Sequence, residues 1–274
     1  MSRSPNAQTA VELYKQLQAE HQWSAADAWK GIAIILLTCE VWGIGWQPFQ
    51  DIVVYRERND FKNGPKGPSA VVKRAEQLTT YLAGELGVSR QDLCNAIGSY
   101  YRHTAIRPLQ PHNLVGHAFR SIVVHILQSH GDPDITYEEE VSPNSEFPGH
   151  GFSTRSKDAK LDIVARRGPR TVALLSSRWR YRHDRVDMID EAIAYAAPAQ
   201  RQNPHCQLYG MVGEFSVPRL VKVLEHCPPL HANGALSALV HFNPDLLWNG
   251  LGENGKTQHL KSLDWLIKET FKWK

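Results

Sequence analysis

Apolar residues along this chain follow two different spacings, and the spacing changes near residue 131. In the first part, apolar positions recur as they do on one face of an amphipathic helix. These stretches predict helices over residues 10–22, 24–39, 69–86, 89–101 and 116–128. In the second part, short apolar runs bounded by Gly, Pro and polar residues alternate with further helical stretches. They predict strands over 136–141, 161–165, 171–175, 207–212 and 235–242, and helices over 186–197, 217–226 and 260–271.

This order of elements predicts the α/β fold class: a central mixed sheet flanked by helices, with a helical N-terminal half. We expect a single domain over residues 1–274, made of a mainly helical part at 1–131 and a sheet-containing core at 132–274. A chain of 274 residues is long enough to bury one large core. Residues 56–68 are expected to form a charged loop, and Pro198 is expected to end the helix before it.

The composition argues against disorder and against a membrane-spanning segment. The chain is 42% hydrophobic and 22% charged, which is too apolar for a disordered protein. Its longest apolar run, residues 31–39, is shorter than the roughly 20 residues that cross a bilayer. The four cysteines lie far apart and form no CxxC pair, so we expect free thiols, a cytoplasmic location and no membrane partner.

The net charge of +3 is modest, but basic side chains are concentrated in one segment. Four arginines fall within eight residues: Arg178, Arg180, Arg182 and Arg185. Such a cluster is typical of nucleic-acid binding, and it is also typical of a surface ion-pair cluster. The residues around it decide between these interpretations.

Two apolar runs, residues 161–165 and 171–175, flank Gly168-Pro169 and predict a β-hairpin. If the turn centres on Pro169, Asp162 lies opposite Ser176, with Cβ atoms about 5 Å apart. Side chains alternate along a strand, so Arg178 points to the same face as Ser176. Such a patch suits Mg²⁺, which takes one or two carboxylates and keeps several waters. Phosphodiester hydrolysis needs a metal of this kind and a nearby cation.

The segment from Ser176 to Arg185, SSRWRYRHDR, resembles the S-x-K-W-x-x-R-x-D-R segment of type II restriction endonucleases in the PD-(D/E)XK superfamily. It is most similar to the branch that recognises CCGG-centred sites, over about residues 158–191. Five of the six specified positions match, at Ser176, Trp179, Arg182, Asp184 and Arg185. The resemblance implies a restriction-endonuclease-like fold and DNA cleavage.

The resemblance also implies a role for each matching position. Asp162 would bind the metal, and Ser176 would stand where many relatives carry a Glu. Relatives of this branch replace that Glu with one on the following helix. Glu191 is the nearest candidate, with Asp190 and Asp187 as alternatives.

The arginine-rich part of the segment would contact the bases of DNA. Arginine bonds bidentately to guanine in the major groove, and aspartate accepts from cytosine. The resemblance assigns base reading to Arg182, Asp184 and Arg185. Arg180, two residues before Arg182, is expected to be a further DNA contact.

Two positions depart from the family pattern. Arg178 replaces the lysine, and a guanidinium stabilises negative charge but cannot act as a base. Lys160, two residues before Asp162, is an alternative. Relatives also carry a Glu in a G-x-x-F-E segment, where this chain has Arg120 after Phe119; another carboxylate, such as Glu76 or Glu139, would replace it.

The sequence therefore predicts a Mg²⁺-dependent, site-specific endonuclease of restriction type that acts on double-stranded DNA. A homodimer is expected, because a two-fold dimer matches a palindromic target. The alternative is a sequence-specific DNA-binding protein with a nuclease fold that has lost cleavage. Arg178 is the residue that separates the two hypotheses.

Overall fold

The computed structural model describes part of the chain, in two compact units. The described residues are 5–33, 35, 83–84, 87–92, 111–150, 152, 160–179, 187–214, 217–228, 230–232, 234–245 and 257–274. The first unit comprises Met1–Trp23 and Trp29–Ala118, and the second comprises Ser24–Ala28 and Phe119–Lys274. The expected loop at 56–68 lies outside the described residues, as do most of the expected helices at 69–86 and 89–101.

The described part of the first unit is helical, as predicted. Helix α1 spans Pro5–His21 and α2 spans Ala28–Ile32. The two helices approach each other at Gly31, where an added Cβ would lie 2.4 Å from the ring of Tyr14. Further along, the Ser89 hydroxyl accepts the backbone N–H of Asp92 at 3.0 Å, a contact typical of the helix start predicted there.

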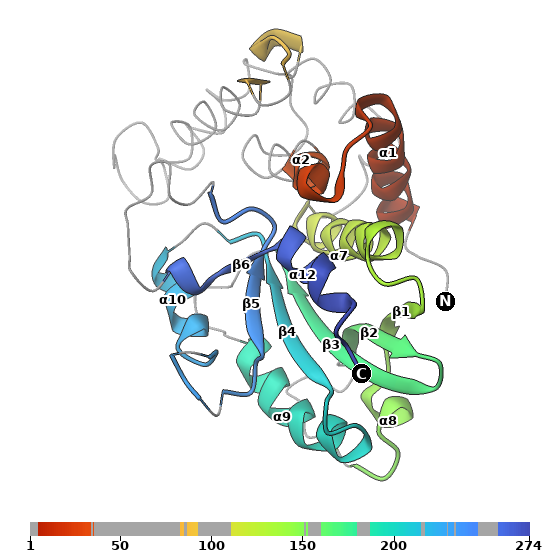
Figure 1. Ribbon diagram of the computed structural model, residues 1–274, viewed down its shortest axis with the longest axis vertical. Coiled ribbons are helices and arrows are strands. Elements are labelled where there is room, and N and C mark those ends of the chain that lie inside the picture. Colours follow the sequence, from red (N-terminus) through yellow and green to blue (C-terminus); the bar gives the residue numbers. More distant parts are fainter. Residues whose placement is uncertain are drawn as a thin grey trace. The chain divides into compact units, whose positions relative to one another are not determined.

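The described part of the second unit contains a six-stranded sheet whose spatial order follows the chain (Figure 1). The strands are β1 Ile135–Val141, β2 Leu161–Arg167, β3 Arg170–Arg178, β4 Gln207–Val212, β5 Ala238–His241 and β6 Lys261–Ser262. Strands β1 to β3 form an antiparallel meander, whereas β3 to β6 run parallel. This mixed sheet with flanking helices confirms the predicted fold class. The two-residue strand β6 is absent from the sequence-based prediction.

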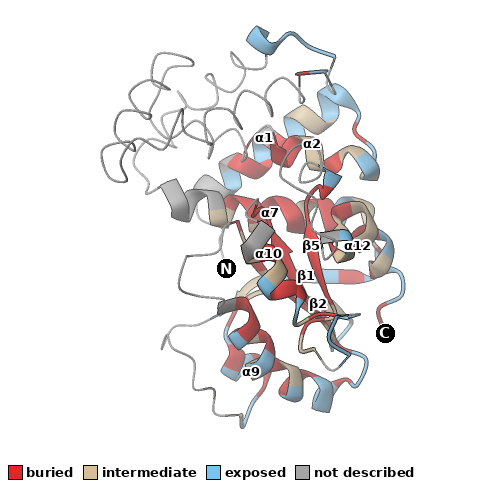
Figure 2. Cartoon of the chain, turned by 90° about the vertical axis from the view of Figure 1, so that its left-hand side faces the viewer, coloured by how far each residue is buried: buried red, intermediate tan, exposed pale blue. Residues whose placement is uncertain are grey.

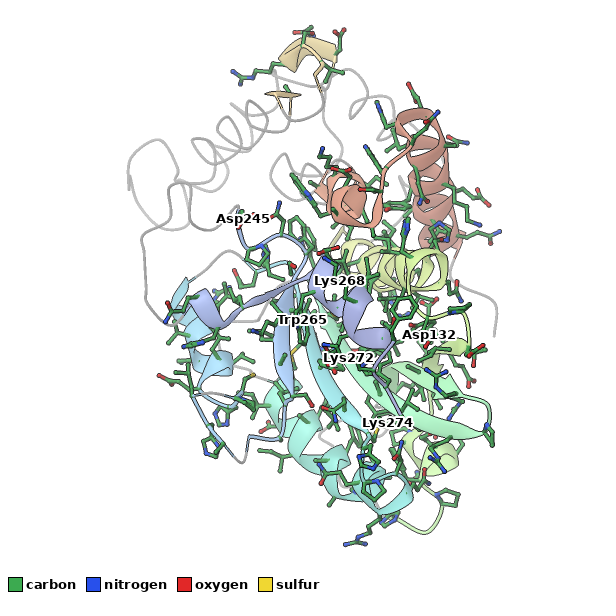
Figure 3. The ribbon with its side chains drawn as sticks, in the orientation of Figure 1. Asp132, Asp245, Trp265, Lys268, Lys272 and Lys274 are labelled. Atoms are coloured by element: carbon green, nitrogen blue, oxygen red, sulfur yellow. The ribbon has the colours of Figure 1, made fainter. Side chains whose placement is uncertain are left out.

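Helices cover both faces of the sheet. Gly210 of β4 pairs with Ser176, and an added Cβ on Gly210 would lie 2.3 Å from Sδ of Met188 in α9, which spans Asp187–Gln202. Its neighbour Tyr209 points to the other face, where the centroid of its ring lies 6.1 Å from that of Trp265. Trp265 belongs to α12 (Figure 3). Helix α12 spans Leu263–Thr270, so α9 and α12 lie on opposite faces. The strands between them are largely buried (Figure 2).

Three further helices are described. They are α7 Pro111–His130, α8 Pro143–Glu146 and α10 Val217–Leu224. Single 3-10 turns lie at Ala25–Asp27 and Thr257–His259. Helix α7 begins five residues before the predicted helix at 116–128, and α8 lies between β1 and β2, where no helix is predicted.

A β-bulge sets the register of the hairpin formed by β2 and β3. Near the turn, Arg167 pairs with Arg170 across the two residues Gly168 and Pro169, and Gly168 has φ 57°. The register shifts by one residue after Ala165, so that Ile163 pairs with Leu175. If this register is continued by one residue, Asp162 lies opposite Ser176, as predicted. Without the bulge, Asp162 would lie opposite Leu175, because a shift of one residue in the register moves every side chain to the other face.

Helix α9 continues through Pro198, so the predicted helix end at this residue is wrong. Proline removes one hydrogen bond and crowds the preceding turn. The last turn is nevertheless held by tertiary contacts. Ala199 is buried, and the side chain of Asn203 donates to the carbonyls of Thr171 at 2.9 Å and Lys274 at 2.7 Å. Burial and these bonds outweigh the local preference.

Trp179, directly after β3, is anchored in the core. Its ring stacks on Phe242 at 5.6 Å and meets Phe119 edge-on at 5.3 Å. An added Cβ on Gly213 would lie 2.2 Å from this ring, so the glycine makes room for it. Trp179 therefore fixes the end of β3, immediately after Arg178.

Gly213→Ala is expected to lower the free energy of unfolding by about 1–3 kcal/mol, the typical cost of overpacking a core. Gly116→Ala is the control, because an added Cβ at this position in α7 meets nothing within 4 Å. Alanine there should stabilise by about 0.5–1 kcal/mol. Urea unfolding measures both changes. A Gly213→Ala variant as stable as the wild type would show that the Trp179 ring does not depend on this space.

Two ion pairs hold the turn end of the hairpin. Arg166 bonds the carboxylate of Glu146 with both terminal nitrogens, at 2.7 and 2.6 Å, and Arg167 bonds Asp132 at 2.6 Å. Burial alone would raise the pKa of Glu146, but hydrogen bonds from Arg166 and Thr171 hold this pKa below its ordinary value. The backbone N–H of Asp134 and the Arg167 guanidinium lower the pKa of Asp132.

These two carboxyls predict a loss of stability in acid. A carboxyl whose pKa is lower in the folded state stabilises fully above its unfolded pKa, and this contribution disappears as the pH falls through the folded pKa. We expect the contribution to be constant above about pH 5 and to fall below about pH 4. Glu146→Gln removes one of the groups, so urea unfolding across this window should show a smaller loss. An unchanged pH dependence would contradict the assignment.

The remaining sequence predictions concern thiols and membranes. Cys206 and Cys227 are free and buried, as expected, and burial raises the pKa of each thiol to about 12. Cys39 and Cys94 lie outside the described residues. Across the described ranges, no helix has both the length and the apolar character to cross a bilayer.

Candidate active site

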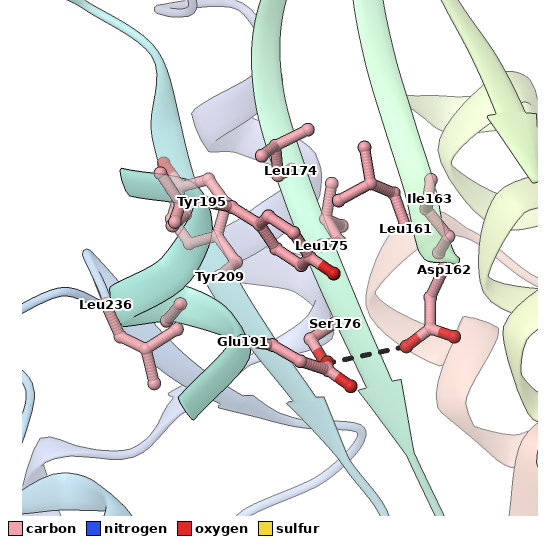
Figure 4. Close-up of a pocket in the computed structure, with 12 residues that line it drawn as sticks. Leu161, Asp162, Ile163, Leu174, Leu175, Ser176, Glu191, Tyr195, Tyr209 and Leu236 are labelled. Atoms are coloured by element: carbon pink, nitrogen blue, oxygen red, sulfur yellow. Dashed lines mark hydrogen bonds between the residues drawn. The ribbon is translucent and has the colours of Figure 1, made fainter. Parts of the chain in front are cut away.

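Four residues predicted from the sequence meet at the end of β3. Asp162 comes from β2, Ser176 and Arg178 from β3, and Glu191 from α9. The Ser176 hydroxyl donates to Glu191 Oε2 at 2.8 Å and lies 3.5 Å from Asp162 Oδ2 (Figure 4). Of the three acidic candidates on α9, Glu191 therefore reaches the hairpin. Asp190 is exposed, and the side chain of Asp187 lies outside the description.

Arg178 bridges the two carboxylates. Its Nη1 donates to Asp162 Oδ2, and its Nη2 donates to Glu191 Oε1. The backbone N–H of Ser177 donates to the same oxygen of Asp162 at 2.9 Å, which fixes the orientation of this carboxylate. Because a guanidinium keeps its proton at any working pH, Arg178 can neutralise charge here but cannot accept a proton.

A second arginine approaches Asp162 from α7. Arg120 bonds Glu139 at 3.2 Å and Glu140 at 2.9 Å, and its Nη1 lies 3.7 Å from Asp162 Oδ1. Neighbouring side chains of a strand normally point to opposite faces. Glu140 has φ 57°, a left-handed backbone conformation, and this lets both carboxylates reach one guanidinium. Arg120 thus gathers Glu139 and Glu140 beside Asp162.

Arg120 and Arg178 join four carboxylates into one network. These are the carboxylates of Glu139, Glu140, Asp162 and Glu191. The side chains of Asp162 and Glu191 are 15% and 23% exposed, so solvent cations have access to both.

A small pocket lies between these groups and α9 (Figure 4). Its polar lining comes from Asp162, Ser176 and Glu191, and its cavity of about 20 Å³ has room for a water molecule. Tyr195, one helical turn after Glu191, also lines it, and its buried hydroxyl has no hydrogen-bond partner among the described residues. Burial, followed by the charges of Glu191 and Asp162, raises the pKa of Tyr195 to about 12, so the phenol keeps its proton.

The donor atoms of the pocket are oxygens. Among the described residues, no group of three or more His, Cys, Asp or Glu side chains is arranged to hold a metal ion. Asp162 and Glu191 supply two carboxylates, and Ser176 adds a hydroxyl. Hard oxygen ligands in this number fit Mg²⁺, which completes its shell with water and substrate phosphate, and do not fit a structural zinc site.

The other predicted site residues are placed differently. The DNA-contact candidates Arg180, Arg182, Asp184 and Arg185 lie outside the described residues, in the segment that joins β3 to α9. Glu76 also lies outside them. Lys160 is exposed and directly precedes β2. Tyr195 is a pocket residue that is not predicted from the sequence. The feature that could have identified it is its spacing of four residues from Glu191 on one helix.

Comparison with known proteins finds one distant structural likeness. No family model matches the chain, and no curated protein matches it. Among solved structures, the restriction endonuclease PspGI in complex with substrate DNA is similar, with a TM-score of 0.40 and 10% sequence identity. The match covers 98% of this chain and 92% of that one.

Proposed function

We propose that this protein is a Mg²⁺-dependent type II restriction endonuclease that hydrolyses phosphodiester bonds in double-stranded DNA. Its target would be a short palindromic site rich in G and C, with CCGG as the candidate centre. The observation that carries the proposal is the meeting of Asp162, Ser176, Arg178 and Glu191 in one hydrogen-bonded cluster at the end of β3. These residues come from two strands and a helix, and the motif in the sequence predicts that they lie together.

Asp162 and Glu191 would hold the Mg²⁺ ion. The two carboxylates and the oxygen donors that line the pocket support this assignment. When bound, the metal would polarise the scissile phosphate and lower the pKa of an attacking water. Two carboxylates leave the rest of its shell to water and to DNA, as is usual for Mg²⁺.

The neighbouring residues would orient the two carboxylates and neutralise negative charge. Ser176 holds Glu191 through its hydroxyl, and the N–H of Ser177 holds Asp162. Arg178 carries a permanent positive charge beside both carboxylates, where it would stabilise the negative charge that develops on phosphate. A bound metal would lower the pKa of its water so that the proton could pass to solvent, and no residue in this set would then need to accept it.

Recognition would come from the segment between β3 and α9. Arg180, Arg182, Asp184 and Arg185 follow Arg178 within seven residues, so base reading and cleavage would share one stretch of chain. Arginine pairs with guanine and aspartate with cytosine in the major groove. A homodimer would present this stretch to each half of a palindrome and cut each strand once.

A second candidate function rests on Arg178. Its guanidinium bonds both carboxylates that would hold the metal. If this arrangement persists on DNA, the chain would bind its site without cutting it. The alternative is therefore a sequence-specific DNA-binding protein with a nuclease fold.

Incubation of the full chain with plasmid DNA and Mg²⁺ tests the proposal. We expect discrete linear fragments that disappear when EDTA replaces Mg²⁺. A gel shift without cutting would favour the DNA-binding alternative, and the absence of both would contradict the two functions together.

A further inference from the structure

The hydroxyl of Tyr195 is buried and is a polar group for which the described residues offer no hydrogen-bond partner. Its side chain is about 4% exposed, and its oxygen has no hydrogen-bond partner in the described part of the chain. A buried hydroxyl without a partner loses its bonds to water, which destabilises the folded state, whereas a phenylalanine at this position would carry no such cost. A partner from outside the chain would account for the tyrosine.

The surroundings of this hydroxyl indicate where such a partner would lie. Tyr195 lines the same pocket as Asp162, Ser176 and Glu191 (Figure 4). It lies four residues after Glu191 on α9, so both side chains project from one face of the helix. The cavity beside them has room for one water, and a protonated phenol can donate one hydrogen bond.

We propose that Tyr195 is a positioning residue of the cation site: its hydroxyl donates to a water in the pocket, and that water bonds the carboxylate pair of Asp162 and Glu191. This inference rests on the proposed function for the identity of the cation. Carboxylates that bind a metal are themselves held by hydrogen bonds, and loss of such an outer contact typically lowers metal affinity by about 10–100-fold. Tyr195 would supply this contact from α9.

Tyr137 provides a matched control. Its hydroxyl is also buried with no hydrogen-bond partner among the described residues. Tyr137 pairs with Ala165 on β2, so it lies on the opposite face of the sheet from Asp162 and does not line the pocket. The same substitution at both positions therefore removes the same group, near the site in one case and away from it in the other.

Calorimetric titration of the metal-free full chain with Mg²⁺, without DNA, is the test. We expect Tyr195→Phe to raise the Kd for Mg²⁺ by about tenfold or more and Tyr137→Phe to leave it unchanged. Neither variant should lose thermal stability without Mg²⁺, because the Phe ring keeps the apolar packing. Tyr195→Phe with the wild-type Kd, or with lower metal-free stability and no change in Kd, would overturn the inference.

The outcomes separate this inference from the proposed function. A wild-type protein that binds no Mg²⁺ would overturn both. If the wild type binds Mg²⁺ without cutting DNA, and Tyr195→Phe weakens that binding, the inference stands and the endonuclease proposal fails. If the wild type cuts DNA and Tyr195→Phe binds Mg²⁺ equally well, the inference alone fails.

Discussion

Asp162→Asn is expected to lower the rate of DNA cutting by about a thousandfold or more, while specific DNA binding is retained. The amide keeps the shape of the side chain and can still accept the N–H of Ser177, which donates to Asp162 Oδ2 at 2.9 Å. It removes the negative charge that would hold Mg²⁺. Loss of one charge-stabilising group in an active site typically costs about 10²–10³ in rate, and loss of a metal ligand should cost at least as much.

The control for this variant is Asp134→Asn. Asp134 is an exposed aspartate that pairs with Arg167 at the far end of the hairpin, so its charge should not affect cutting. Cleavage is followed as linear product from supercoiled plasmid, and binding is followed by gel shift in EDTA. Cutting by Asp162→Asn at the wild-type rate would remove Asp162 from the site.

Arg178→Lys is expected to cut at least as fast as the wild type, whereas Arg178→Met should lose about 10²–10³ in rate. Arg178 now contacts both carboxylates through the two terminal nitrogens of its guanidinium. A lysine keeps the positive charge but has a single compact ammonium, so it would hold the pair less firmly and would leave more room for Mg²⁺. Methionine keeps the length of the side chain and removes the charge.

This pair of variants also separates the two candidate functions. For an endonuclease that uses Arg178 to stabilise charge, the lysine variant is active and the methionine variant is impaired. For a DNA-binding protein whose Arg178 blocks the metal site, the wild type does not cut and the lysine variant gains cutting. A lysine variant as impaired as the methionine variant would show that the two-pronged contact is needed, and would weaken the likeness to the S-x-K motif.

The sequence alone predicts the hairpin that carries the site. Two apolar runs around Gly168-Pro169 are enough to place Asp162 opposite Ser176. The register of β2 and β3 extends to this position, and the two side chains lie 3.5 Å apart. The agreement depends on two features of the hairpin that offset each other. The turn is centred between Gly168 and Pro169 and not on Pro169, and the extra residue of the bulge restores the expected register. No local pattern in the sequence announces this bulge.

Tertiary contacts account for the structural features that are not predicted from the sequence. Pro198 is a strong local signal for a helix end, but the buried Ala199 and the side-chain bonds of Asn203 keep α9 helical beyond it. The bridge from Arg178 to Glu191 and the approach of Arg120 to Asp162 depend on how α9 and α7 pack on the sheet. Spacing along the chain leaves three acidic candidates on α9, and the packing of this helix on the sheet determines that Glu191 reaches the hairpin.

Sequencing the ends of digested DNA tests the central claim most directly. A plasmid library or a genomic DNA of known sequence is incubated with the full chain and Mg²⁺, and the termini are mapped. We predict that all ends fall at one short palindromic sequence, rich in G and C, with a fixed offset of the cut on each strand. Ends scattered without a common sequence, or intact DNA under conditions where the protein binds it, would contradict a site-specific endonuclease.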